Sequence, residues 1–237
     1  MMEDLSKPHA TSEAVNVHYD SSYFAWQRSG GELVAIADRW KFERFIHTDD
    51  TVLDFGCGGG YLLATFPCRT RYGVELNAVA RREAAQVLDV VEDIDQLSPD
   101  VQFDVIISHH ALEHVDAPLY VLRKLRDKLK MSGKIVFVVP SESWHKQREY
   151  RADDINQHLY TWTPLLLGNL FARAGFHVES VDLLCHRWLP KSEKLRRLVP
   201  ASFFDSRLFH LGCWLWSAVT RSRQIRIVAS RSQSEPS

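Results

Sequence analysis

The sequence predicts an α/β fold built on a largely parallel sheet, and three observations carry that prediction. Short apolar runs with β-branched residues recur along the chain, as at 51–55 (TVLDF) and 103–108 (FDVIIS), which is typical of strands buried on both faces. Segments with apolar residues at helical spacing separate these runs. The first run passes through a glycine-rich turn, GCGGG at 56–60, directly into a helical pattern.

Length and composition agree with a globular protein. A chain of 237 residues holds one α/β domain with an appendage, and 45% hydrophobic with 25% charged residues is an ordinary composition. The net charge of −1 gives no general reason to expect a nucleic-acid partner. The charge is unevenly spread, because residues from 187 onward hold ten basic against three acidic side chains, a balance of +7 that leaves −8 for the rest.

The cysteines and the ends of the chain point to a reducing compartment. Four cysteines, at 57, 68, 185 and 213, lack metal-site or secreted-scaffold spacing, so we expect free thiols. The acidic, polar start MMEDLS is not a signal peptide. The longest apolar window, 208–219, is too short to span a bilayer. Cytoplasmic location is therefore expected.

Aromatic residues gather ahead of the first strand. Residues 18–27 (HYDSSYFAWQ) hold four aromatic side chains just before Gly30 and Gly31. They either form a helix packed on the core or cap a ligand, with Tyr23, Trp26 and Gln27 nearest to it. Residues 33–46 follow with apolar side chains at helical intervals and are expected to form a helix.

The glycine turn has the properties of a ligand site. Glycine has no Cβ and tolerates positive φ, so backbone can approach a ligand closely at 56–60. A second strand at 71–75 would place the Glu75 carboxylate beside this turn, where it can accept both hydroxyls of a ribose. The spacing does not fit the dinucleotide fingerprint, which needs glycine or alanine at position 61, whereas this chain has Tyr61.

The remaining elements alternate between helix and strand. Residues 77–86 read as a helix capped by Asn77, and 87–94 as a strand with an acidic exit. The strand at 103–108 leads into HHALEHV at 109–115, at the sheet edge where ligands bind. The later elements expected are a helix at 116–131, a strand at 134–140, a polar loop at 141–157, a helix at 161–174 and strands at 176–185 and 224–229.

These motifs together resemble class I S-adenosylmethionine-dependent methyltransferases. TVLDFGCGGG resembles motif I of that family, Glu75 matches its acidic ribose ligand, and AGF at 174–176 is similar to the family's entry into strand six. The resemblance implies a Rossmann-like, seven-stranded, mainly parallel sheet with an antiparallel last strand over residues 30–231, preceded by a cap segment at 1–29 and followed by a tail at 232–237. It also implies S-adenosylmethionine as cofactor and methyl transfer to a small acceptor, most simply on oxygen of a metabolite, sugar or lipid-like molecule.

The resemblance also implies a set of cofactor-binding residues. In the family, an acidic residue after strand three binds the adenine amino group and the next apolar residue packs on the ring, which points to Asp93 and Ile94. Glu92 or Asp95 would take the place of Asp93 if the strand were shifted in register. Alternatively, these acidic residues bind no ligand and are simply solvated in a loop. The full set comprises Asp54, Gly56, Cys57, Gly58, Glu75, Leu76, Asp93, Ile94 and His109, with Tyr23, Trp26 and Gln27 from the cap segment.

Methyl transfer to a hydroxyl needs a base near the acceptor, and HHALEHV offers His110, Glu113 and His114 as catalytic candidates. Trp144, His145 and His158 of the following polar segment are candidate substrate contacts. His110, Glu113, His114 and His158 resemble the E-x-x-E-H metal element of ubiquinone-biosynthesis and small-RNA 3′-end O-methyltransferases, but His110 replaces a glutamate there. We therefore favour no metal; a purely structural role for these residues also stays open.

Residues 187–223 form a basic, aromatic insert between the last two strands, where the family usually has a tight hairpin. The insert is compatible with a substrate lid or core packing, an oligomer face, or contact with a membrane surface. A small-molecule acceptor is the expected partner and DNA is not. RNA 2′-O-methylation is disfavoured because the catalytic part is acidic, and a non-catalytic cofactor-binding scaffold is the alternative from another class.

Overall fold

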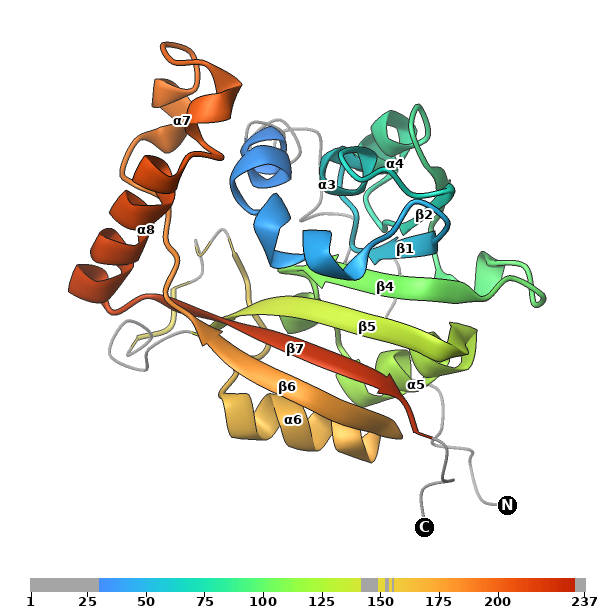
Figure 1. The fold of residues 1–237 in the computed structure, drawn as a ribbon. Helices are drawn as coiled ribbons and strands as arrows, with labels where there is room; N and C mark the ends of the chain where they lie inside the picture. The colour runs from blue at the N-terminus through green and yellow to red at the C-terminus, as the bar shows by residue number, and fades with distance from the viewer. Residues whose placement is uncertain (1–29, 142–148, 152–153, 155, 233–237) are drawn as a thin grey trace.

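The computed structural model describes residues 30–141, 149–151, 154 and 156–232. A seven-stranded sheet in the order β3-β2-β1-β4-β5-β7-β6 runs through it (Figure 1). β7 is antiparallel to both of its neighbours, and the other pairings are parallel. The predicted fold class is thus confirmed. The strands are β1 (Thr51–Phe55), β2 (Thr70–Val74), β3 (Asp89–Val91), β4 (Phe103–His109), β5 (Leu129–Ser141), β6 (Phe176–Leu184) and β7 (Arg223–Arg231).

Helices cover both faces of the sheet (Figure 1). α5 and α6 lie against one face, and the helical residues 30–37 with α3 and α4 lie on the other. The α-helices are α3 (Tyr61–Ala64), α4 (Ala78–Ala84), α5 (Pro118–Lys128), α6 (Pro164–Arg173), α7 (Ser192–Leu195) and α8 (Arg207–Thr220). Short 3-10 turns are η1 (Arg39–Lys41), η2 (Glu43–Phe45), η3 (Ile94–Gln96), η4 (Leu112–His114) and η6 (Ala201–Phe203).

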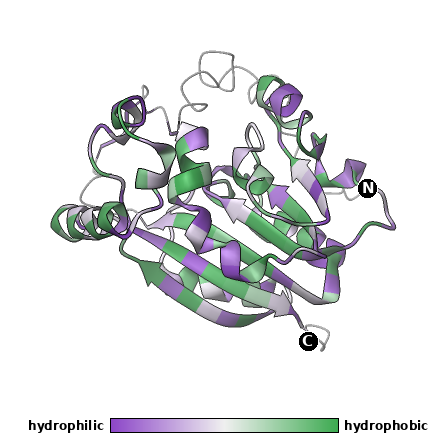
Figure 2. Cartoon of the chain, turned by 45° about the horizontal axis from the view of Figure 1, so that its top comes forward, coloured by the Kyte–Doolittle hydropathy of each residue, from purple (hydrophilic) through white to green (hydrophobic). Residues whose placement is uncertain are grey.

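Successive residues of the central strands feed two separate cores. In β4, Ile106 packs into the core beneath α5 and α6, whereas Val105 and Ile107 pack into the core on the opposite face. This alternation follows from the two-residue period of a strand, and it explains why the central strands are apolar at nearly every position. The central strands are correspondingly hydrophobic in Figure 2.

Several of the expected elements have other boundaries, and three of these differences have a clear physical reason. The helix expected at 33–46 is helical only to residue 37 and then breaks into η1 and η2, because Asp38 turns inward to pair with Lys41 at 2.9 Å. The strand expected at 87–94 is limited to β3, since the Asp93 carboxylate accepts the amide of Asp95 and starts η3. The helix expected to reach residue 131 ends with α5, because Leu129 already pairs with Phe103 in the sheet.

The insert at 187–223 folds into α7, η6 and α8 and packs on the helical residues 30–37. Leu33 and Ala37 share a small core with Phe204, Phe209 and Cys213 of the insert. The opposite side of α8 carries exposed apolar side chains, including Leu208, Leu211, Trp214, Leu215 and Val219. Among the residues that the structure describes, no helix has both the length and the apolar character needed to cross a membrane.

Candidate active site

The glycine turn after β1 forms one wall of the site. Gly56, Gly58 and Gly60 have φ angles of 75°, 54° and 80°, a backbone conformation that side chains with a Cβ rarely adopt. A Cβ added to Gly56 would lie 2.4 Å from the Cβ of Ala111, whereas one added to Gly58 would meet open space. Gly56 is therefore required for packing against the segment after β4, and Gly58 leaves room for a ligand.

The Glu75 carboxylate is tied to this turn by two backbone amides. Its Oε2 accepts the amide of Gly58 and its Oε1 accepts the amide of Asn77, each at 2.8 Å. Burial nevertheless raises the pKa of Glu75, and the amides and Arg81 oppose that rise. Asn77 caps α4 as predicted, accepting the amides of Val79 and Ala80. A carboxylate fixed in this way keeps further lone pairs for ribose hydroxyls.

Asp54 provides a second carboxylate at the end of β1. It is 2% exposed and lines the cavity described below. Burial, and then repulsion from Glu75, raises the pKa of Asp54 to about 7. A buried carboxylate beside a second, half-buried one favours a cationic ligand, because the positive charge offsets their mutual repulsion. This fits the sulfonium and ammonium groups of S-adenosylmethionine.

A single cavity of about 680 Å³ joins the glycine turn to the histidine segment. Its walls come from the carboxyl ends of β1, β4 and β5, from the helical residues 30–37, and from both ends of the insert. The described residues that line it on the cofactor and histidine side include Asp54, Gly56, Cys57, Gly58, Tyr61, His109, His110, Glu113, His114 and His158. Cofactor and acceptor can therefore meet in one space.

The histidines after β4 are held by a buried charged network. His109 Nε2 lies 3.2 Å from Oδ2 of Asp38 and 3.4 Å from Nζ of Lys41. Its ring stacks on that of His110 with centroids 4.5 Å apart. Burial is the main reason that the pKa values of both imidazoles are lowered, that of His110 well below its usual value. His110 also has a left-handed φ of 56°, and its amide donates to the carbonyl of Val138.

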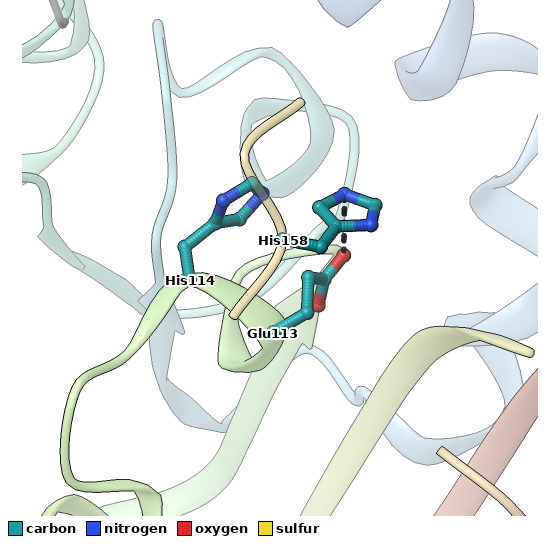
Figure 3. Close-up of side chains that lie close together, drawn as sticks. All are labelled: Glu113, His114 and His158. Carbon is teal, nitrogen blue, oxygen red and sulfur yellow. Dashed lines mark ion pairs between the residues drawn. The ribbon is translucent and has the colours of Figure 1, made fainter. Parts of the chain in front are cut away.

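Glu113 is the centre of a second cluster (Figure 3). Its side chain is fully buried, and Oε1 lies 3.7 Å from Nδ1 of His110 and 4.0 Å from Nε2 of His158. The rings of His114 and His158 meet edge to face with centroids 4.8 Å apart. The amide of Leu159 donates to the Glu113 carbonyl at 2.9 Å, which fixes His158 against η4 although 44 residues separate it from His114.

This cluster brings together three side chains of metal-ligating types. Glu113, His114 and His158 each offer one ligand atom within 4.8 Å of the others. Ligands about 2.1 Å from one ion lie at most about 4.2 Å apart, so the cluster would have to contract to bind a cation. The remaining member of the predicted metal set, His110, approaches the cluster through Glu113.

The other predicted residues occupy varied positions. Leu76 is 53% exposed, and Asp93 is exposed and caps η3. Ile94 is buried in the core beneath that edge of the sheet. Burial raises the pKa of the Cys57 thiol well above its usual value, so this cavity-lining cysteine is not a ready nucleophile. Tyr23, Trp26, Gln27, Trp144 and His145 lie outside the described residues.

Sequence reasoning missed several residues of the cavity wall. These are Asp38, His186, Arg187, Trp188, Arg221, Arg223 and Gln224. Asp38 pairs with the fully buried Lys41, whose Nζ donates to Oε1 of Gln224 at 2.5 Å. One signal was available: a last strand antiparallel to the others must begin at the edge where the parallel strands end, which places Arg223 and Gln224 at the ligand edge.

The fold and this site define a class of protein. Class I S-adenosylmethionine-dependent methyltransferases share three features with this chain. They have a glycine turn after the first of seven strands and an acidic residue after the second. They also have a cavity at the carboxyl edge of a sheet whose last strand is antiparallel. A model of the methyltransferase domain family matches residues 27–181. The chain belongs to this family, which confirms the enzyme class and the cofactor expected from the sequence.

Similar proteins agree on the class and differ in what they act on. Malonyl-[acyl-carrier protein] O-methyltransferase of Priestia megaterium is 28% identical over 103 residues, 39% of this chain and 38% of that protein. Ubiquinone biosynthesis O-methyltransferase of Serratia proteamaculans is 33% identical over 102 residues, which are 38% of this chain and 42% of that protein. A tRNA U34 carboxymethyltransferase of Shewanella amazonensis is 29% identical over 116 residues, which are 41% of this chain and 35% of that protein. The match thus spans about two fifths of these relatives' length.

The likeness in fold extends over most of the chain. The structure of a SAM dependent methyltransferase from Archaeoglobus fulgidus superposes with a TM-score of 0.63 and 21% identity. It covers 90% of this chain and all of the other. The family model ends at residue 181, before the insert and before the arginines of the cavity wall.

Proposed function

We propose that the protein transfers the methyl group of S-adenosylmethionine to a hydroxyl oxygen of a small acceptor bound in the cavity. The observation that carries this proposal is that Glu113 and the neighbouring imidazoles of His110 and His158 line the same cavity as the glycine turn. A hydroxyl of high pKa must lose its proton when it attacks a methyl group, and this cluster provides proton acceptors.

The cofactor supplies a methyl group on a positively charged sulfur, so the leaving group is neutral. The protein then has to position the acceptor and take up its proton. Asp54 and Glu75 bind the cationic and ribose parts of the cofactor, as the two carboxylates at this edge allow. As the oxygen–methyl bond forms, the acceptor proton moves to a ring nitrogen of His114 and leaves later to water.

His110 is a poor candidate for the base. Burial, His109 and Lys41 hold the pKa of His110 well below its usual value, which makes that imidazole a weak base. His114 is half-buried, lines the cavity and packs against His158 beside Glu113. The Glu113 carboxylate would stabilise the imidazolium that forms, as a buried carboxylate does in other acid–base pairs. We therefore assign His114 as base and Glu113 as its positioning partner.

The experiment is methyl transfer from radiolabelled S-adenosylmethionine to a panel of phenols, sugars, lipids and small RNAs. We expect labelling of a small hydroxyl acceptor, a fall in kcat of about 100-fold or more in His114→Asn, and a smaller fall in His110→Asn. Cofactor affinity, measured by isothermal titration, should be unchanged in both variants. Labelling of RNA alone would replace the acceptor class, and cofactor binding without transfer to any acceptor would favour a scaffold.

A chelator separates proton transfer by His114 from metal assistance. Activity of the wild-type protein should survive EDTA, because the proposed base needs no ion. Loss of activity in EDTA, restored by Mn²⁺ or Mg²⁺ in the wild type but not in His158→Ala, would instead assign the cluster to a cation.

A further inference from the structure

Three arginines line the cavity on the side away from the glycine turn. Arg187 follows β6, Arg221 ends α8 and Arg223 begins β7. The ammonium group of Lys41 does not belong to this cluster of positive charge, because its Nζ forms an ion pair with Oδ1 of Asp38 at 2.9 Å. The insert therefore delivers both of its ends, and three guanidinium groups, to one wall of the site.

The sheet register fixes the distance between this wall and the histidines. His109 lies opposite Val138 of β5, and on the other side of β5 Arg223 lies opposite Ser141, three residues further toward the ligand edge. Neighbouring strands are about 4.8 Å apart, and β5 lies between β4 and β7. The axes of β4 and β7 are therefore roughly 10 Å apart, measured across the strands. A small molecule can reach from one to the other.

Two of the arginines are held in place by neutral hydrogen-bond acceptors. Arg187 donates to Oγ of Ser222 at 3.0 Å, which joins the exit of β6 to the entry of β7. Arg223 donates to the carbonyls of Ser217 at 2.7 Å and Ser222 at 3.0 Å. Among the described residues, no carboxylate forms an ion pair with any of the three. Arg221 has a left-handed φ of 52°, a strained conformation for a residue with a Cβ.

The two ends of the cavity thus differ in charge. Asp54 and the nearby Glu75 form the acidic end, which suits a cationic cofactor. The arginine end is positive, and guanidinium groups bind carboxylate and phosphate oxygens through paired hydrogen bonds. Arg187 and Arg221 are exposed at the mouth of the cavity and Arg223 is half-buried, so an anionic group on the acceptor can reach all three.

We propose that the methyl acceptor carries an oxyanion, a phosphate or a carboxylate, which binds to Arg187, Arg221 and Arg223 while its hydroxyl lies at the histidine cluster. This inference rests on the proposed function and narrows its acceptor class. The anionic group selects and orients the acceptor, and the reacting hydroxyl lies at the other side of the same cavity.

The test is isothermal titration of the protein, saturated with S-adenosylhomocysteine, with four probes: phenyl phosphate, benzoate, the short-chain lipid dihexanoyl phosphatidic acid, and benzyl alcohol. We expect at least one anionic probe to bind about tenfold or more tightly than the alcohol, as loss of a hydrogen bond to a charged group predicts. Which anion binds best then distinguishes a phosphomonoester, a carboxylate and a lipid headgroup.

Two double variants each remove two positive charges, one pair from the cavity wall and the other from the outer surface of the insert. Arg187→Gln with Arg221→Asn acts on the cavity wall, and asparagine tolerates the left-handed backbone at 221. Lys194→Gln with Arg197→Gln removes two exposed charges of the insert that are not among the cavity-lining residues. The first variant should lose anion binding and the second should keep it. Equal losses in both, or no preference for anions in the wild type, would overturn the inference.

Cofactor titration makes the two proposals separable. The wild type and both double variants should bind S-adenosylmethionine equally, since the arginines lie away from the glycine turn. Failure of the wild type to bind the cofactor would defeat the proposed function, whatever the probes show. Normal cofactor binding without a preference for anions would defeat only the oxyanion inference.

Discussion

The amide of Gly58 donates a 2.8 Å hydrogen bond to the carboxylate of Glu75, and this bond joins the glycine turn after β1 to the end of β2. The same carboxylate also accepts the amide of Asn77, at the start of α4. One acidic side chain therefore holds two backbone segments in position. The site's shape and its acidity depend on the same residue.

Replacing Glu75 with alanine should weaken cofactor binding sharply. The substitution removes the ribose ligand and also leaves the Gly58 and Asn77 amides without their acceptor, so we expect the Kd for S-adenosylmethionine to rise about 10- to 100-fold. Isothermal titration measures it. Glu179→Ala, which removes a carboxylate paired with Lys134 on the far side of the sheet, is the control. Equal affinity of Glu75→Ala and wild type would contradict the assignment.

Asp54 should make cofactor binding depend on pH. Its pKa is about 7 in the protein without cofactor, so the carboxyl must lose a proton before it can attract a cation. We expect the affinity for S-adenosylmethionine to rise between about pH 6 and pH 8 in the wild type and to be lower and flatter over that window in Asp54→Asn. Titrations at several pH values test this, and a similar slope in both proteins would assign the proton to another group.

The same carboxyl should lower the stability of the cofactor-free protein above neutral pH. Its pKa is higher in the folded state than the ordinary value of 3.8, so the folded protein binds the proton more tightly. Stability from this group is therefore present at low pH and is lost as pH rises from about 4 to 7. Asp54→Asn should raise the free energy of unfolding at pH 8 by about 1–3 kcal/mol. Urea denaturation at pH 5 and pH 8 measures it, with a smaller gain expected at pH 5.

Two glycines of the turn should respond differently to alanine. Both have positive φ, so each substitution costs about 1–2 kcal/mol of backbone strain. Gly56→Ala adds a collision with Ala111 and should lose about 2–4 kcal/mol in total, whereas Gly58→Ala meets open space. Thermal or urea denaturation compares them. Cofactor binding should fall in Gly58→Ala, because the methyl group of the new alanine would occupy ligand space.

Lys41 should be necessary for folding although it touches no ligand. It is fully buried and paired with Asp38, so Lys41→Met leaves a buried carboxylate without its main partner and should cost about 3–5 kcal/mol. Asp38→Asn combined with Lys41→Met should cost less than Lys41→Met alone, because no charge is then left unpaired. Equilibrium unfolding of the two variants decides this. A larger loss in the double variant would show that Asp38 acts through other contacts.

The sequence alone determined the fold, and it predicted the residues at the cofactor end of the site. Strand periodicity, the glycine turn and Glu75 are local features, because burial on two faces, positive φ and the residue after a strand all leave marks within a few positions. They were sufficient to predict the sheet, the cofactor end and the segment from His109 to His114. Helix boundaries were less accurate where a tertiary contact intervened, as when Asp38 pairs with Lys41 and the helix breaks.

Only the tertiary structure decided what stands opposite the cofactor. His158 reaches Glu113 because two amides of the following residues donate to the Glu113 carbonyl, and Arg223 reaches the cavity because β7 runs antiparallel to β5. The sequence suggested the first contact only through a family resemblance and the second only through the expected direction of the last strand, since each contact joins segments separated by dozens of residues whose pairing depends on the whole sheet. The methyl donor could thus be predicted from a short motif, whereas the character of the acceptor end depends on the assembled fold.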